Sequence, residues 1–271
     1  MDSRLAQILE TYRGRDKIIR LTAYSCGFVG GLLSNTKLKS LGKSLTILSG
    51  NLNETRTVLR LFDDVSMWVH CKNYGIGSKE EDLLLRLTTL IDNFLGQAYY
   101  PVEHIAWARD NKILQGQTNL LWTVGILLWL GSLCVSIFQS LWLLRQLRKD
   151  VENWRKGRKR GLEEEAGTGM SLEENTQSRT VEQPSIDRQL QEARYLQEQK
   201  FWIKARERQL IVTTVGSLAD AFNAVHWLPP GFLWSGTFNQ TVVGFLGTVS
   251  SAAMLYNYLN PVKPIFKEKN I

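Results

Sequence analysis

Two neighbouring pairs of side chains in this sequence have the residue types of catalytic groups. His70 precedes Cys71, a combination used in nucleophilic catalysis, and Glu103 precedes His104, a potential acid–base pair. Adjacent residues of a helix do not face each other, so His70 is poorly placed to take a proton from Cys71. We interpret His104 as a hydrogen-bonded structural histidine.

No other motif in the sequence indicates an enzyme. The chain has no Gly-rich phosphate loop, no His-Glu-x-x-His and no Gly-x-Ser-x-Gly. Its three cysteines are far apart and include no Cys-x-x-Cys pair, which argues against a zinc site or a disulfide framework. We therefore predict no catalytic residue, no bound metal and no cofactor.

The stretch 55–70, TRTVLRLFDDVSMWVH, has the apolar spacing of an amphipathic helix. Its apolar residues recur at intervals of three and four and so share one face. These residues are Val58, Leu61, Phe62, Val65, Trp68 and Val69. Arg56, Arg60, Asp63 and Asp64 lie opposite, and Asn51 or Asn53 is the expected cap. The pattern alone favours burial of this face in a domain core, with a lipid surface as the alternative.

One segment in the middle of the chain is almost entirely apolar. Residues 120–144 read LLWTVGILLWLGSLCVSIFQSLWLL and contain no charged residue. At about 1.5 Å per residue this segment reaches roughly 37 Å, enough to cross a bilayer core of about 30 Å. Trp122 and Trp142 lie near its ends, where interfacial aromatic residues are found. We predict a transmembrane helix.

A second charge-free window covers residues 221–262 and contains TVVGFLGTVSSAAMLYNYL at 241–259. This segment spans only about 28 Å as a helix, which is marginal for a crossing. Gly244 and Gly247 would allow close helix packing in lipid. We expect a second crossing, with a hairpin lying against the membrane as the alternative.

The whole chain is predicted to be all-α, because no run of alternating strand-like residues occurs. We divide it into an N-terminal amphipathic helical domain (1–119), a transmembrane helix (120–144), a basic run with a disordered linker and a charged helix (145–210), an apolar helix with a Pro-Pro turn (211–240), a second transmembrane helix (241–259) and a tail (260–271).

Three further features are expected inside the N-terminal domain. Gly27 and Gly31 should let two helices pack closely within the domain, and Pro101 should break a helix. A third feature is an apolar stripe that resembles an ordinary core face. It consists of Leu84, Leu87, Leu90, Ile91 and Phe94.

Positive charge is concentrated directly after the first transmembrane helix. The chain carries a formal net charge of +7, and the run 145–160 reads RQLRKDVENWRKGRKR. Its basic residues are Arg145, Arg148, Lys149, Arg155, Lys156, Arg158, Lys159 and Arg160. A juxtamembrane position favours anionic phospholipid headgroups over nucleic acid as the partner. A simple anchoring role is the alternative.

Four motifs, spread in order over both halves of the chain, match one family. They read YRGRDKIIRL, TRTVLRLFDDVSMWV, YYPVEHIAWARD and LADAFNAVHWLPPGFLWSG. Together they resemble the peroxisomal membrane protein 11 family, with the gamma (C) type as the nearest. The segment around 151–205 departs from that type because it is longer and more charged than expected.

The resemblance implies a multi-pass protein of the peroxisomal membrane, with both termini in the cytosol, that promotes elongation and division of the organelle. It implies that the amphipathic helix inserts into the outer leaflet, with Arg56 and Arg60 at the headgroups. It also implies homo- or hetero-oligomers with family paralogues, dynamin-type fission machinery with its membrane adaptors, and an import receptor for peroxisomal membrane proteins that reads the basic run.

Tethering by a transmembrane helix raises the local concentration of the amphipathic helix at the surface. With the resemblance, this favours the membrane over the core as the partner of that helix. Two alternatives stay open. One is a membrane-anchored adaptor that keeps the helix in its own core. The other is a small-metabolite channel, which is less favoured because the two crossings hold no ionisable residue. The positive-inside rule, unlike the resemblance, places the basic run in the cytosol.

Overall fold

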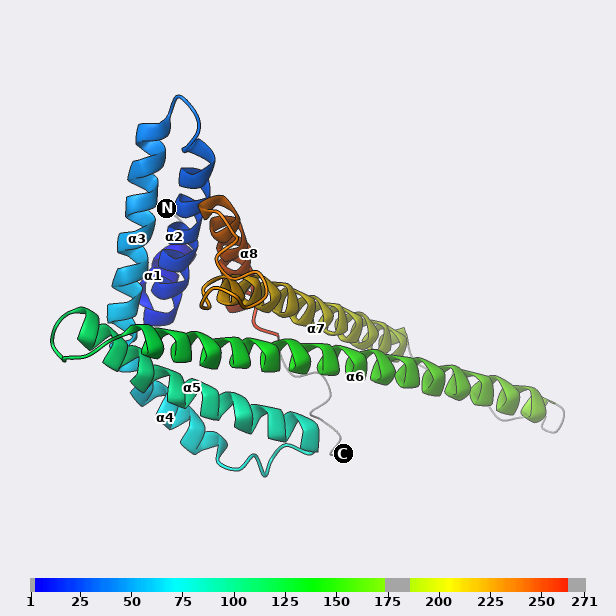
Figure 1. The fold of residues 1–271 in the computed structure, drawn as a ribbon. Helices are drawn as coiled ribbons and strands as arrows, with labels where there is room; N and C mark the ends of the chain where they lie inside the picture. Colours follow the sequence, from blue (N-terminus) through cyan, green and yellow to red (C-terminus); the bar gives the residue numbers. More distant parts are fainter. Residues whose placement is uncertain (1–2, 174–185, 263–271) are drawn as a thin grey trace. The chain divides into compact units, whose positions relative to one another are not determined.

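The computed structural model describes residues 3–173 and 186–262 (Figure 1). All regular structure in these ranges is helical, which confirms the all-α fold class. The helices are α1 (Ser3–Glu10), α2 (Tyr12–Leu33), α3 (Lys39–Leu59), the 3-10 turn η1 (Arg60–Phe62), α4 (Asp63–Tyr74), α5 (Leu83–Asp110), α6 (Asn119–Glu173), α7 (Ile186–His226) and α8 (Gln240–Leu259).

The described residues divide into two compact units. The first contains residues 3–140 and 212–260, and the second contains residues 141–173 and 186–211. Helices α6 and α7 each contribute to both units. The candidate insertion face and the cavity described below belong to the first unit, and the whole basic run 145–160 belongs to the second.

Helices α2 and α8 pack closely because small residues line their contact. A Cβ atom added to Gly244 would lie 2.4 Å from the backbone nitrogen of Phe28, so no larger residue fits there without a shift of the backbone. Gly31 meets Thr241 in the same contact. Gly31 therefore allows close helix packing, but its partner is α8, the second candidate membrane helix, and not another helix of the predicted N-terminal domain.

Helices α5 and α6 run antiparallel within the first unit, and Figure 1 shows them side by side. Near one end, the Nε1–H of Trp122 donates to Asp110 at 2.7 Å. Further along, the hydroxyl of Ser132 donates to Asp92 at 2.5 Å. The start of α5 is fixed by Asp82, whose carboxylate accepts hydrogen bonds from backbone N–H groups of the first turn.

Several predicted boundaries are wrong. Helix α3 begins at Lys39 and runs through Asn51 and Asn53, so neither is an N-cap. Helix α5 continues through Pro101 to Asp110. Helix α6 does not end near 144 but extends to Glu173, into the region predicted as a disordered linker. The rest of that linker, residues 174–185, and most of the tail lie outside the described residues.

The stripe on α5 is also different from the prediction. Leu87, Ile91 and Phe94 are exposed, and Phe94 is 70% exposed. Leu84 and Leu90 are half-buried. The stripe is therefore not a core face of the first unit, and α5 presents apolar side chains outward.

Candidate membrane-facing site

The apolar side chains predicted to insert into lipid are mostly exposed in the first unit. Phe62 is 78% exposed and Trp68 is 62% exposed, whereas Leu61 is half-buried. We call the six predicted residues the α4 face. They are Val58, Leu61, Phe62, Val65, Trp68 and Val69. Exposure on this scale, over neighbouring large apolar side chains, is typical of an interaction surface. Their insertion into lipid stays a prediction.

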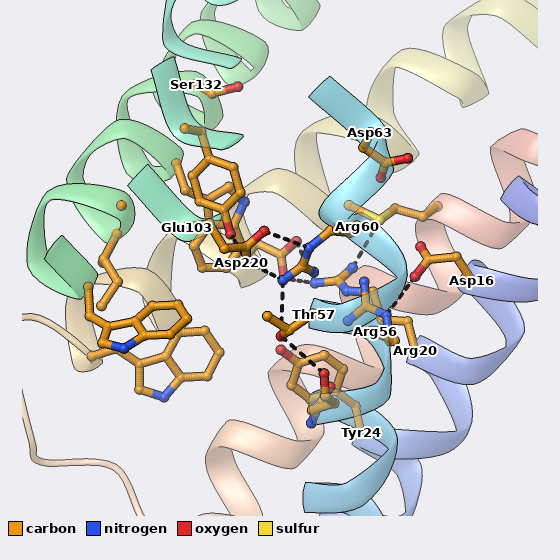
Figure 2. A pocket seen from close by; sticks show the side chains of 18 of the residues that line it. Asp16, Arg20, Tyr24, Arg56, Thr57, Arg60, Asp63, Glu103, Ser132 and Asp220 are labelled. Carbon is orange, nitrogen blue, oxygen red and sulfur yellow. Dashed lines mark hydrogen bonds and ion pairs between the residues drawn. The ribbon is translucent and has the colours of Figure 1, made fainter. Parts of the chain in front are cut away.

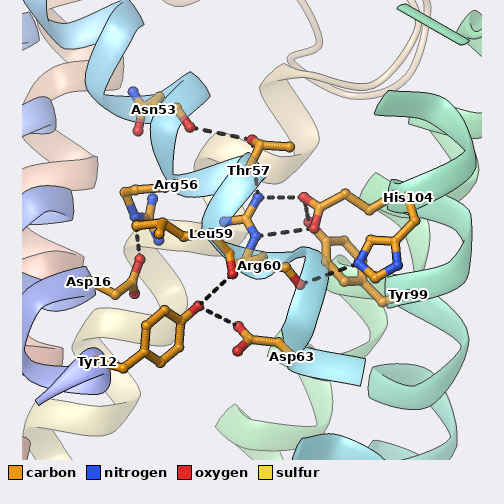
Figure 3. A network of polar contacts seen from close by, with 11 residues as sticks. Tyr12, Asp16, Asn53, Arg56, Thr57, Leu59, Arg60, Asp63, Tyr99 and His104 are labelled. Atoms are coloured by element: carbon orange, nitrogen blue, oxygen red, sulfur yellow. Dashed lines mark hydrogen bonds and ion pairs between the residues drawn. The ribbon is translucent and has the colours of Figure 1, made fainter. Parts of the chain in front are cut away.

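The α4 face is carried by two helices and a tight turn, whereas a single helix was predicted. Helix α3 ends at Leu59, and the 3-10 turn η1 separates it from α4. Side chains from distant segments bind the carbonyl oxygens at this break (Figure 3). The hydroxyl of Tyr12 donates to the oxygen of Leu59 at 3.2 Å, and Nε2 of His104 lies 3.3 Å from the oxygen of Arg60. These partners compete with α-helical hydrogen bonds, which accounts for the local tightening.

Arg56 and Arg60 pair with carboxylates inside the first unit (Figure 3). The Nε–H of Arg56 donates to Asp16 at 2.8 Å, and Arg56 is buried. Arg60 forms an ion pair with Glu103, which also accepts a hydrogen bond from the hydroxyl of Tyr99 at 2.7 Å. These contacts anchor the end of α3 to α2 and α5. Contact of Arg56 and Arg60 with lipid headgroups stays a prediction.

Asp63 lies at the start of α4 and has an uncharged hydrogen-bond partner. The hydroxyl of Tyr12 donates to its carboxylate at 3.1 Å. Partial burial raises the pKa of Asp63 above its ordinary value; the hydrogen bond from Tyr12 opposes this shift, and the nearby charge of Asp16 reinforces it. Ionised Asp63 is therefore less favourable in the fold than in the unfolded chain.

A cavity of about 920 Å³ lies within the first unit, next to the segment that carries the α4 face. Figure 2 shows arginine and acidic side chains from several helices converging on it. Three arginines of its lining form ion pairs with carboxylates. The pairs are Arg20 with Asp220, Arg56 with Asp16 and Arg60 with Glu103. A cavity lined by ionisable groups can hold water and polar solutes.

The pair between Arg20 and Asp220 is the most deeply buried of the three. Arg20 is 5% exposed and Asp220 is 1% exposed. The guanidinium donates to both carboxylate oxygens, at 2.8 and 2.9 Å, and so connects α2 with α7. This pair was not predicted from the sequence. The available signal was that each charge stands alone between apolar residues, in IIRLTAY and SLADAF.

Three of the four side chains first considered for catalysis contact separate structural partners. Glu103 contacts Arg60 and Tyr99, whereas His104 contacts a backbone oxygen. The thiol of Cys71 lies 3.7 Å from the carbonyl oxygen of Asn93. Among the described residues, no group of three His, Cys, Asp or Glu side chains is placed to hold a metal ion.

Within residues 3–173 and 186–262, two helices are long and apolar enough to cross a membrane, judged by length and composition. They are the segment Asn119–Arg160 of α6 and the segment Gln240–Leu259 of α8. The first contains the predicted segment 120–144 and continues through the basic run, and the second matches the predicted segment 241–259 to within one residue. The structure contains no lipid, so their crossing of a bilayer rests on composition and on the family assignment below.

The basic run forms the part of α6 that follows the apolar segment. Its lysines and arginines are exposed except for Arg158, which is half-buried and lies over the ring of Trp154. Arg148 pairs with Glu207 at 3.6 Å, and Lys156 pairs with Glu152 at 2.6 Å. A role for the run in targeting or headgroup binding stays a prediction.

These features define an α-helical protein with two candidate membrane helices. The family model for peroxisomal biogenesis factor 11 (PEX11) matches residues 3–259. Peroxisomal membrane protein 11C of Mus musculus is 38% identical over 251 residues, covering 92% of this chain and 90% of the relative. The protein of the same name in Homo sapiens is 37% identical over 256 residues, covering 94% of this chain and 92% of the relative. No solved structure matches.

The chain belongs to the PEX11 family of peroxisomal biogenesis factors. The resemblance drawn from four motifs is thereby confirmed, over nearly the whole chain. Its close homologues are peroxisomal membrane proteins.

Proposed function

We propose that this protein promotes elongation and fission of peroxisomes by inserting the α4 face into the cytosolic leaflet of their membrane and by self-association. The exposure of the α4 face is the observation that carries the proposal. A soluble domain rarely leaves Phe62, Val65 and Trp68 together in water, and a lipid surface would shield them.

The free energy of insertion is modest for an isolated α4 face. It is sufficient for membrane binding when a membrane helix tethers the face to the surface. Fully burying a Val, Leu or Phe side chain contributes roughly 1.5–3 kcal/mol. Six side chains inserted about halfway contribute on the order of 5–8 kcal/mol before ordering costs. The membrane helix keeps the face near the surface and raises its effective concentration. Insertion into one leaflet expands that leaflet relative to the other and so bends the membrane. Several copies side by side would increase this curvature.

The proposed topology is multi-pass, with both termini in the cytosol. The proposed partners of the chain are anionic phospholipids, family paralogues in homo- or hetero-oligomers, dynamin-type fission machinery with its membrane adaptors, and an import receptor that binds the basic run of α6. Family membership supports association with the peroxisomal membrane, and each partner needs its own binding experiment.

An adaptor function is the first alternative. In the adaptor hypothesis the α4 face is buried in the core of its own domain. The exposure of Phe62 and Trp68 argues against such burial. An adaptor would instead use the exposed face to bind a protein. Substitutions on the face would then abolish partner binding and leave the curvature of protein-containing vesicles unchanged.

A small-metabolite channel is the second candidate, and the cavity favours it. The argument against a channel was that the crossings hold no ionisable residue, but the cavity brings Arg20 and Asp220 into the same lining as Trp129 of α6. Gly125 of α6 also lines it. Gly125→Leu, which narrows the cavity, should reduce release of a small anionic dye from proteoliposomes if the cavity conducts.

Peroxisome shape in cells tests the main proposal. The full chain carrying both Phe62→Glu and Val65→Glu should reach peroxisomes but fail to elongate them, because two carboxylates on the α4 face oppose insertion. Phe201→Glu is the matched control, since Phe201 is 62% exposed and lies in the second unit. Organelle length and number are measured by fluorescence microscopy. Normal elongation by the double variant would count against the proposal.

A further inference from the structure

The second unit contains a cluster of positive charge where α6 meets α7. A pocket of about 400 Å³ is lined by Trp154, Arg155, Arg158 and Lys159 of α6 and by Lys200 of α7. Among the described residues of this lining, four are basic and none is acidic. We call the four basic residues and Trp154 the basic pocket. It joins side chains of two helices, which the run 145–160 alone does not reveal.

The register of the two helices places like charges opposite each other. Arg148 of α6 pairs with Glu207 of α7 at 3.6 Å. About two helical turns further along α6 is Arg155, and about two turns back along α7 is Lys200. The neighbouring position therefore has two positive charges where the first has opposite ones, and both side chains line the pocket. Facing like charges repel each other and oppose the contact between the helices.

The basic residues of α6 in the pocket share one face of that helix. Arg155 lies three residues before Arg158 and four before Lys159, and like charges at these spacings destabilise a helix. The guanidinium of Arg158 lies over the ring of Trp154, 5.9 Å from its centroid, and this cation–π contact orients it at the pocket. Concentrated charge with one oriented guanidinium is the arrangement of an anion site.

The anion that fits this pocket carries phosphate groups. A guanidinium binds phosphate oxygens in a bidentate manner, and a lysine ammonium binds them as a point charge. A phosphate monoester carries about −1.5 to −2 charges near neutral pH, so two phosphate groups match the four cations of the pocket. The volume of the pocket is within the range of about 300–1,000 Å³ that is common for small-molecule sites.

The position of the pocket along α6 separates it from lipid headgroups. Trp154 lies ten residues beyond Leu144, the last residue of the predicted membrane segment, which is about 15 Å along a helix. The headgroup layer on each side of a bilayer is only about 5–8 Å thick. Arg145 and Lys149 lie nearer to the apolar segment and suit headgroups better. A ligand of the basic pocket therefore reaches it from water.

We propose that the basic pocket binds a soluble anion with at least two phosphate groups. The anion neutralises the facing charges of Arg155 and Lys200 and thereby tightens the contact between α6 and α7 within the second unit. With both termini in the cytosol and two crossings, the basic run lies on the matrix side, so the ligand is a phosphorylated compound of the peroxisome matrix. The inference goes beyond the proposed function and does not require insertion of the α4 face.

Calorimetric titration of the purified full chain with inorganic pyrophosphate tests this site. The chain is reconstituted into nanodiscs of neutral phospholipid at fixed ionic strength, and inorganic phosphate is the comparison ligand. The variant Arg155→Gln with Lys200→Gln removes the two facing charges. The control Arg145→Gln with Lys149→Gln removes the same charge from exposed positions of the basic run outside the lining. A second set of nanodiscs contains a lipid with a phosphorylated inositol headgroup.

Thermal unfolding of each protein without ligand shows whether the variants fold. The pocket variant should unfold at no lower temperature than the control, because it loses a repulsion between helices. Lys200→Gln alone, which leaves α6 unchanged, is the second variant, and it should bind pyrophosphate about threefold more weakly than the unmodified chain.

The expected result is saturable binding of pyrophosphate, weaker binding of phosphate, and an affinity that falls about tenfold in the pocket variant but little in the control. The two kinds of nanodisc should give the same affinity. Equal weakening in both double variants, or no saturable binding to the unmodified chain, would overturn the site and leave a diffuse attraction of anions to the run. Loss of pyrophosphate binding only in nanodiscs with the inositol lipid would overturn the soluble ligand and assign the pocket to a headgroup.

Discussion

Arg20 and Asp220 are separated by 200 residues in the sequence, yet the guanidinium of one donates to both oxygens of the other at 2.8 and 2.9 Å. Both side chains are almost fully buried. A buried ion pair of this kind is weak evidence for net stability, but removal of one partner leaves an unpaired charge in the interior. The pair therefore fixes how α2 meets α7 within the first unit.

Breaking this pair on one side should destabilise the fold strongly. Asp220→Asn leaves the Arg20 guanidinium buried without a counter-charge, and we expect a loss of about 3–5 kcal/mol in the free energy of unfolding. The double variant Arg20→Met with Asp220→Leu carries no buried charge and should recover most of the loss. Thermal unfolding in detergent, followed by circular dichroism, measures both. Arg13→Met, on an exposed side chain, is the control.

If the single and the double variant unfold at the same temperature as the unmodified chain, the ion pair does not hold α2 against α7. Equal destabilisation of both variants would instead assign the loss to packing, because the double variant removes the charge but keeps the altered shape.

The contact between α2 and α8 should tolerate no Cβ atom at Gly244. Gly244→Ala places a methyl group against the backbone of Phe28, and we expect a loss of roughly 1–3 kcal/mol in unfolding free energy. Gly50→Ala in α3 is the matched control, because a Cβ there meets nothing within 4 Å. Alanine inside a helix is favoured over glycine by up to about 1 kcal/mol, so the control should gain stability. A stable Gly244→Ala protein would contradict the described contact.

Replacing Asp63 should stabilise the protein in a pH-dependent way. The pKa of Asp63 is raised in the fold, so its ionised form is disfavoured there relative to the unfolded chain. The penalty is absent well below the ordinary pKa of an aspartate, grows as the pH rises through the interval up to the raised pKa, and is complete above it. Asp63→Asn should therefore raise the unfolding temperature near neutral pH and have little effect near pH 3.

This prediction is checked by measuring the unfolding temperatures of the unmodified chain and of Asp63→Asn between pH 3 and neutral pH. A stabilisation by Asp63→Asn that is largest in acid, or a loss of stability near neutral pH, would show that the ionised carboxylate is favoured in the fold.

Local patterns were sufficient to predict the all-α class and the two candidate membrane segments. Helical periodicity and uninterrupted apolar runs are properties of short windows, so both can be recognised without the tertiary structure. Phe62 and Trp68, which the periodicity assigned to one face, are both exposed. The pattern did not reveal the break at η1, because its causes are Tyr12 and His104, which reach Leu59 and Arg60 from distant segments.

The roles of the charged residues and of the apolar stripe on α5 were not predictable in this way. Arg56 and Arg60 share the periodicity of solvent-facing residues, and only the tertiary structure shows Asp16 and Glu103 opposite them. The stripe through Leu87 and Phe94 has the same spacing whether it faces a core or acyl chains. Periodicity identifies a face, but the partner of the face depends on what packs on the other side.

Tubulation of liposomes by the purified full chain tests the central claim most directly. The protein is reconstituted into anionic vesicles and imaged by electron microscopy, alongside Phe62→Glu and the matched Phe201→Glu variant. The account predicts tubules with the unmodified chain and with Phe201→Glu, and round vesicles with Phe62→Glu at equal protein content. Tubules of equal frequency with Phe62→Glu, or round vesicles with all three proteins, would contradict membrane remodelling by the α4 face.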